Sequence, residues 1–241
     1  MPTTRFTYGG RGYLRFAALA VPVPSASGMC EVSIDRAGPG RVHISILAAD
    51  PITEEAVDAL AERVRSQVVA FCQAPIRDFG KDTVEHIADD GSKKRNLFAR
   101  TLASRVELDV RVPSEHQSDM RPDDVSDLRD VIATRPAIPA RLVASLDHSL
   151  LQATSDVEAF LAVYSVLQSV LGKQADVDSF ILAAEPNCEM ATDSRGRQVT
   201  IYTKLRNAKG HPTGMPPQEA SERISRLLPT LRQHAKSALF R

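Results

Sequence analysis

An arginine, an asparagine and a histidine lie close together in the segment KLRNAKGHPTG, near the end of the chain. Arg206 can hold two phosphate oxygens through its planar guanidinium, and His211 titrates near neutral pH and can exchange a proton. Asn207 can orient the phosphate or the imidazole, and Lys204 and Lys209 add positive charge that can bind RNA phosphates. These residue types suit cleavage of RNA by its own 2′-hydroxyl, which needs a base, an acid and a cation but no metal ion.

The spacing of these residues matters if the segment is helical. At about 100° per residue, Asn207 and His211 lie roughly 40° apart on one face, whereas Arg206 points about 140° away from His211. Arg206 therefore converges with His211 only through its long side chain or through a symmetry mate.

The same segment has an alternative interpretation without chemistry, as the end of a helix. Lys204, Arg206 and Lys209 complement the negative end of the helix dipole, Gly210 suits a left-handed cap, and Pro212 prevents continuation. Both interpretations remain open at the level of sequence.

The charge of the chain is unevenly distributed. The formal net charge is zero, which argues against a protein that coats nucleic acid non-specifically. Residues 195 to 241, however, carry ten Lys or Arg against only Glu219 and Glu222. Such asymmetry suits a phosphate-binding region, and it also suits the solvated basic face of a helix.

The N-terminal half alternates between apolar and polar residues in the manner of a sheet. CEVSID and RVHISIL are joined by RAGPG and predict a β-hairpin, which GYLRFAALAV precedes as a further strand. From Thr53 the apolar spacing changes to three and four residues and predicts a helix that ends before Pro75. Residues 76 to 103 are charged and irregular, and SRVELDVRVP predicts one more strand.

The C-terminal half is expected to be helical. Residues 116 to 136 read as a linker with one short helix near 123 to 133. Helices are predicted over ARLVASLDHSLLQA, over SDVEAFLAVYSVLQSVLG, over 176 to 184, over 197 to 209, and after Pro217 with a kink at Pro229. The predicted fold is α+β: a small N-terminal domain of mixed helix and sheet over 1 to 115, the linker, and an all-α helical bundle over 137 to 241.

A late bundle helix that carries RNAKGH resembles the ribonuclease-type motif, R-x4-6-H, of the HEPN superfamily. The phrase TKLRNAKGHPTG looks like that superfamily's segment around the motif, and FLAVYSVLQSVLG looks like its long upstream helix. The resemblance covers about residues 137 to 241. Arginine is a common residue in this chain, so an arginine at this spacing from a histidine is weak evidence by itself. The helical context and the following Asn207 carry more of the resemblance.

The resemblance implies a metal-independent endoribonuclease of a bacterial defence or stress system. Its catalytic residues would be Arg206, Asn207 and His211, with Lys204 and Lys209 binding RNA or nucleotide phosphate. A homodimer that faces two motifs across a cleft is implied, with a regulatory protein as a further partner. The alternative is a non-catalytic HEPN-like module that binds nucleotide or RNA, or dimerises, while the N-terminal domain binds a partner protein.

Other chemistries find little support in the sequence, which predicts no cofactor and no metal. YGGRGY lacks the order of strand, turn and helix that a dinucleotide site requires, and is expected to be a bend beside a strand. Cys30, Cys72 and Cys188 lie far apart, which fits a reducing, cytoplasmic setting. FAALAVPV is too short for a signal core or a membrane span. His43, His86, His116 and His148 are expected to have no catalytic role.

Overall fold

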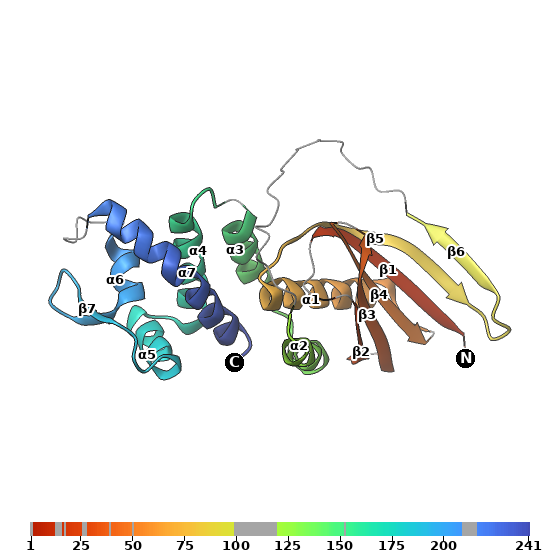
Figure 1. The fold of residues 1–241 in the computed structure, drawn as a ribbon. Helices are drawn as coiled ribbons and strands as arrows, with labels where there is room; N and C mark the ends of the chain where they lie inside the picture. The colour runs from red at the N-terminus through yellow and green to blue at the C-terminus, as the bar shows by residue number, and fades with distance from the viewer. Residues whose placement is uncertain are drawn as a thin grey trace. The chain divides into compact units, whose positions relative to one another are not determined.

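The computed structural model describes residues 2–12, 16, 18–25, 28–38, 40–49, 51–98, 120–151, 153–208 and 216–241. The chain forms two compact units, Met1–Ala137 and Ile138–Arg241. The first is built on an antiparallel sheet and the second is mostly helical, so the α+β prediction is confirmed (Figure 1). The predicted strand SRVELDVRVP lies outside the described residues.

The first unit contains six strands in the order β2-β3-β4-β1-β5-β6, and every pairing is antiparallel. Its elements along the chain are β1 (Thr3–Gly12), β2 (Ala18–Ser25), β3 (Gly28–Gly38), β4 (Arg41–Ala49), α1 (Glu54–Cys72), β5 (Ile76–Ile87), β6 (Lys93–Leu97) and α2 (Pro122–Thr134). Alternate residues of the central strands are buried against the helices, as the period-two pattern predicts. Helix α2, in the segment expected to be a linker, packs against β2 and α1.

Helix α1 forms where it does because residues at both of its ends have the conformation and the hydrogen bonds of helix caps. Thr53 accepts a hydrogen bond from the amide of Ala56 at 3.3 Å, and Glu54 and Glu55 occupy the first turn, where negative charge is favourable. At the other end Gln73 adopts a left-handed conformation, with φ of 51°, and stops the helix. The predicted hairpin and the predicted helix of this unit are therefore confirmed.

Two expectations for the first unit were wrong. Residues 76 to 103 are not irregular throughout, because β5 and β6 form a hairpin within them and β5 pairs with β1 along its length. The YGGRG part of YGGRGY is not a bend, because it lies within β1. In β5 the buried Glu85 breaks the apolar pattern, and Arg5 and Arg95 neutralise it from neighbouring strands.

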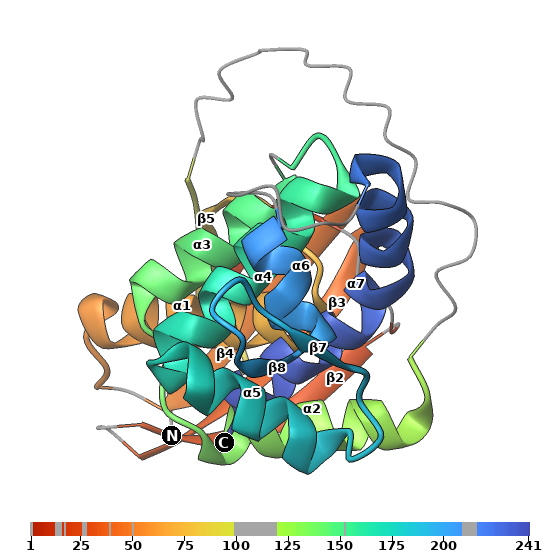
Figure 2. The same ribbon diagram turned by 90° about the vertical axis from the view of Figure 1, so that its left-hand side faces the viewer.

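The second unit is a helical assembly with one small hairpin. Its elements are α3 (Ala140–Leu151), α4 (Asp156–Leu171), α5 (Gln174–Ala184), β7 (Met190–Thr192), β8 (Gln198–Thr200), α6 (Ile201–Ala208) and α7 (Pro217–Leu239). Helices α4, α6 and α7 lie side by side around an apolar core (Figure 2). The expectation of an all-helical bundle is corrected here, because β8 replaces the start of the helix predicted over 197 to 209.

Helix boundaries in this unit follow from capping residues. Ser155 accepts from the amide of Glu158 at 3.3 Å, while the carboxylate of Glu158 accepts from the amide of Thr154 at 2.8 Å. Gly172, with φ of 100°, ends α4, as a C-terminal glycine does. Helix α7 continues through Pro229, whose side chain lies on the exposed face.

Candidate phosphate-binding site

Helix α6 carries the arginine and asparagine of the predicted motif, and its apolar face fixes which way they point. Ile201, Tyr202 and Leu205 are buried in the core of the second unit. Arg206 consequently faces solvent, and Asn207 is half-buried at the edge of the same helix.

The start of α6 is fixed by a carboxylate from a different helix. Oδ1 of Asp178, on α5, accepts hydrogen bonds from the amide of Thr200 at 3.2 Å and its hydroxyl at 2.6 Å. The same oxygen accepts from the hydroxyl of Thr203 at 2.7 Å. A negative group at a helix N-terminus satisfies free amides and is favourable with the helix dipole. Asp178 therefore sets the position and direction of α6.

Tyr164 of α4 connects this buried network to the exposed arginine. Its hydroxyl and that of Thr203 are 2.6 Å apart, and the guanidinium carbon of Arg206 lies 5.8 Å from the centre of its ring. Burial raises the pKa of Tyr164 to about 12, and the negative charge of Asp178 adds to this rise, against the opposing effects of Thr203 and Arg206. The phenol is therefore neutral at physiological pH.

The guanidinium of Arg206 is oriented by two side-chain amides. Nη1 donates to Oδ1 of Asn207 at 2.9 Å, and Nη2 donates to Oε1 of Gln168, on α4, at 3.5 Å. Arg206 forms no ion pair with any residue that the structure describes. Its charge is thus held in place over an aromatic ring, exposed to solvent and without a carboxylate partner, an arrangement suited to binding an oxyanion.

The remaining predicted site residues lie apart from this arrangement. Nζ of Lys204 donates to the carbonyl oxygen of Thr192 at 2.8 Å, which ties α6 to the hairpin. Lys204 and Arg206 are two residues apart and so point about 160° away from each other around the helix axis. Lys209 and His211 lie outside the described residues. The structure therefore brings Arg206 and Asn207 together and describes no imidazole beside them.

Sequence reasoning missed Tyr164, Thr203 and Asp178, and it did not predict that Gln168 would contact Arg206. Tyr164 and Gln168 are four residues apart on α4, so their spacing alone placed them on one helical face. No sequence signal paired that face with α6. Asp178 lies 22 residues from Thr200 and could be found only through the packed structure.

A second polar cluster joins α5, α6 and α7 on the inside of the unit. The hydroxyl of Tyr202 donates to Oε2 of Glu185 at 3.0 Å, and Nε2 of His234 lies 3.3 Å from the same oxygen. Burial, followed by Glu185, raises the pKa values of Tyr202 and of the nearby thiol of Cys188. With His234 buried between the rings of Tyr202 and Phe180, the cluster stabilises the helix packing rather than presenting a reactive group to solvent.

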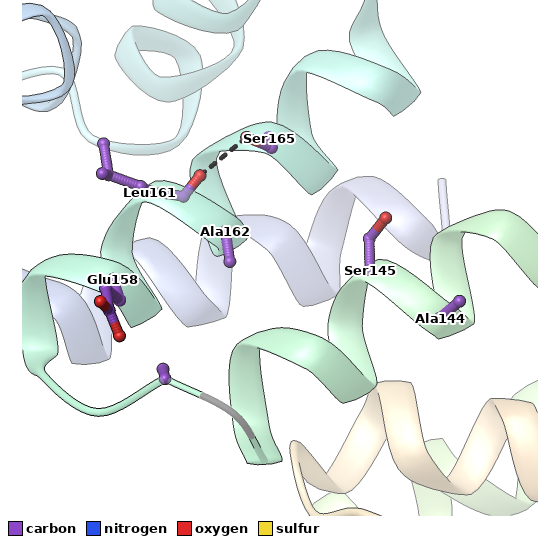
Figure 3. A pocket seen from close by; sticks show the side chains of 7 residues that line it. Ala144, Ser145, Glu158, Leu161, Ala162 and Ser165 are labelled. Atoms are coloured by element: carbon purple, nitrogen blue, oxygen red, sulfur yellow. Dashed lines mark hydrogen bonds between the residues drawn. The ribbon is translucent and has the colours of Figure 1, made fainter. Parts of the chain in front are cut away.

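A groove of about 640 Å³ runs between α3 and α4 (Figure 3). Its lining consists of Ala144, Ser145, Ala153, Glu158, Leu161, Ala162 and Ser165. The hydroxyls of Ser145 and Ser165 donate to carbonyl oxygens of their own helices, at 3.0 and 2.8 Å. Glu158 accepts from Thr154, so the polar groups of the described lining residues are engaged locally.

Over the described ranges, no group of three or more His, Cys, Asp and Glu side chains is placed to hold a metal ion. No helix in this part of the chain combines the length and the apolar character that a membrane crossing requires.

Comparison with known proteins gave no match: no family model, no curated protein and no solved structure is significantly similar to this chain.

Proposed function

We propose that the C-terminal unit is a HEPN-like, metal-independent endoribonuclease that acts as a homodimer. The observation that carries the proposal is the exposed guanidinium of Arg206, which Asn207 and Gln168 orient over Tyr164 without a carboxylate partner in the described chain. Such a group can hold the scissile phosphate and offset the charge that develops on it. The three cysteines are free and buried, which supports a cytoplasmic location.

In this proposal RNA supplies its own nucleophile. A base removes the proton of the 2′-hydroxyl, the O2′–P bond forms, and the P–O5′ bond breaks as an acid protonates the leaving 5′-oxygen. His211 exchanges these protons, and a second copy of the chain brings its own motif to the same cleft. The products are a 2′,3′-cyclic phosphate and a 5′-hydroxyl. The N-terminal unit binds the regulatory protein partner of a bacterial defence or stress system.

A second candidate function is RNA or nucleotide binding without turnover. It is favoured by the chemistry of the side chains that contact Arg206. Asn207 and Gln168 are amides that do not titrate, and the pKa of Tyr164 is raised to about 12. These residues hold a phosphate but do not transfer a proton at neutral pH. Catalysis therefore depends on His211.

The two functions are separated by assaying cleavage and binding of a labelled single-stranded RNA in EDTA. The wild type is compared with Arg206→Ala, His211→Ala and Arg226→Ala, which removes an exposed arginine of α7 as a matched control. For the enzyme we expect cleavage to a cyclic phosphate, a loss of about a hundredfold or more in the first two variants, and no loss in the control.

Each other outcome has a distinct meaning. Binding without cleavage, weakened by Arg206→Ala but not by His211→Ala, would support the binding function and contradict the endoribonuclease. Equal cleavage by all four proteins would remove the catalytic assignment. If the wild type does not cleave RNA and binds neither RNA nor a nucleotide such as ATP, both functions are wrong.

A further inference from the structure

Three arginines form a row across one end of the N-terminal sheet. In the antiparallel register Arg11 of β1 lies opposite Arg41 of β4 on one side and opposite Arg77 of β5 on the other. Residues directly opposite each other in an antiparallel pair project to the same face, and neighbouring strands are about 4.8 Å apart. The three side chains therefore start from adjacent positions on one face of the sheet.

That face is the one turned away from α1 and α2. Val42 and Ile76, the sequence neighbours of Arg41 and Arg77, are buried in the core of the unit. Because successive residues of a strand point to opposite faces, the two arginines lie on the open face with Arg11. The side chain of Arg11 is 60% exposed, so the row is accessible to a ligand.

The glycines of YGGRGY explain how this row is assembled. A Cβ atom on Gly10 would lie 2.5 Å from Cγ2 of Ile76, and one on Gly12 would lie 2.6 Å from the carbonyl oxygen of Pro75. Only glycine at these positions lets β5 approach β1 closely enough to place Arg77 beside Arg11. The motif thus serves the packing of β5 next to the arginine row.

Of these three arginines, Arg11 and Arg77 already make interactions within the chain, and Arg41 is the one without a partner among the described residues. Arg11 donates from Nε and Nη2 to Oδ2 of Asp78, a residue with φ of 49°, which Asp tolerates better than most residues. In the part of the chain that the structure describes, the side chain of Arg41 has no partner. Like charges placed directly opposite each other destabilise a sheet.

The other nearby carboxylates lie one row further along the sheet, beside His43. Asp35 is opposite His43 in the register, and Oδ2 of Asp82 lies 3.9 Å from Nε2 of His43. Asp82 leans across Gly9, because a Cβ on that glycine would come within 2.1 Å of its Oδ2. Asp82 therefore lies beside the imidazole, and Asp35 lies opposite it in the register, two residues along β4 from Arg41.

We propose that Arg11, Arg41 and Arg77 bind a phosphate group. A guanidinium presents a planar fork of donors that matches two phosphate oxygens, and it stays charged at all physiological pH values. Adjacent arginines whose strands are about 4.8 Å apart converge on one tetrahedral anion, which removes the repulsion between them. The phosphate comes from a nucleotide or from an RNA backbone, and this site is independent of the one around Arg206.

The test is a calorimetric titration in an Arg206→Gln background, which removes phosphate binding at the other site. Inorganic phosphate, ATP and a short single-stranded RNA are each titrated into this parent, into its Arg41→Gln and Arg77→Gln variants, and into its Arg129→Gln variant. Arg129 is an exposed arginine of α2 and serves as the matched control. We expect phosphate affinity to fall about tenfold or more in the first two variants and to stay unchanged in the control.

If Arg77→Gln fails to fold, phosphate binding is tested on Arg41→Gln by thermal unfolding at low salt. Because Arg41 has no partner among described residues, Arg41→Gln should unfold at or above the temperature of the parent. In that variant added phosphate should raise the unfolding temperature less than in the parent. Tighter binding of ATP or of RNA than of inorganic phosphate identifies the source. Absence of binding to the parent, or equal binding by all variants, overturns the proposal.

Discussion

Asp193 organises the turn of the β7–β8 hairpin through both of its carboxylate oxygens. Oδ1 accepts from the amides of Arg195 and Arg197 at 2.8 and 2.9 Å, and Oδ2 accepts from Nε of Arg197 at 2.8 Å. The hydrogen bonds from Arg197 are the main reason that the pKa of Asp193 falls to about 2. Since β8 leads directly into α6, one carboxylate helps to fix the helix that carries Arg206.

The lowered pKa of Asp193 gives a pH-dependent prediction. A carboxylate whose pKa is lower in the folded state stabilises that state above its ordinary value of 3.8, and the contribution is lost as the pH falls toward about 2. Asp193→Asn should therefore unfold at lower urea concentration than wild type at neutral pH, and the difference should disappear between these two pH values. Exposed Asp127→Asn should show no comparable pH-dependent difference, and a constant difference for Asp193→Asn would contradict the linkage.

At the scale of elements, Gln67 of α1 holds the end of α2. Its side chain is fully buried, and Nε2 donates to the carbonyl oxygens of Arg135 and Pro136 at 2.9 and 3.1 Å and to that of Val131 at 3.4 Å. Arg135 and Pro136 directly follow the last residue of α2, and the carbonyl of Val131 also accepts from the amide of Arg135 at 2.9 Å. Gln67 therefore links α1 to the segment in which α2 ends.

Replacing Gln67 should loosen α2. Gln67→Leu keeps the approximate volume but removes the hydrogen bonds to these carbonyl oxygens, so we expect a loss of about 0.5–1.5 kcal/mol in the free energy of unfolding. Gln67→Glu should cost more, because it buries a carboxylate against carbonyl oxygens. Urea denaturation measures both, with exposed Gln233→Leu as the control. A stability of Gln67→Leu equal to that of wild type would show that these hydrogen bonds do not hold α2.

Elements with local signals were predictable from the sequence. The β3–β4 hairpin and α1 combine apolar periodicity with turn or capping residues inside the segment itself. Strand β5 was not predictable, because its buried charges are offset by residues far along the chain. Nζ of Lys81 lies 2.8 Å from Glu54 and 3.0 Å from Asp58 of α1, and their hydrogen bonds raise the pKa of Lys81 against the opposing effect of burial.

In the candidate site, likewise, contacts between sequence neighbours were predictable and contacts between distant helices were not. Arg206 and Asn207 are neighbours in sequence, so their proximity required no knowledge of the fold. The amide of Gln168 and the ring of Tyr164 reach Arg206 only because α4 packs against α6, and packing between helices distant in sequence leaves no local pattern. The arginine row of the sheet depends likewise on strand register, which pairs β1 with two strands that follow it later in the chain.

The whole molecule is built from two separate apolar cores. In the first unit the fully buried side chains include Val32, Ile34, Ile44, Val57, Val64 and Ile132. In the second unit one cluster joins α4, α5, α6 and α7 and contains Phe160, Leu167, Ile181, Tyr202 and Leu231. A unit that has an apolar core of its own can open independently.

Independent cores predict that damage to one unit stays within it. Ile44→Ala and Leu167→Ala each remove buried methyl groups. Each should lower the free energy of unfolding of its own unit by about 2–5 kcal/mol. Hydrogen exchange followed by mass spectrometry should then show faster exchange in peptides from residues 1 to 137 for Ile44→Ala, and from 138 to 241 for Leu167→Ala. The two variants serve as controls for each other. Loss of protection in both units from a single substitution would mean that the chain opens as one cooperative structure.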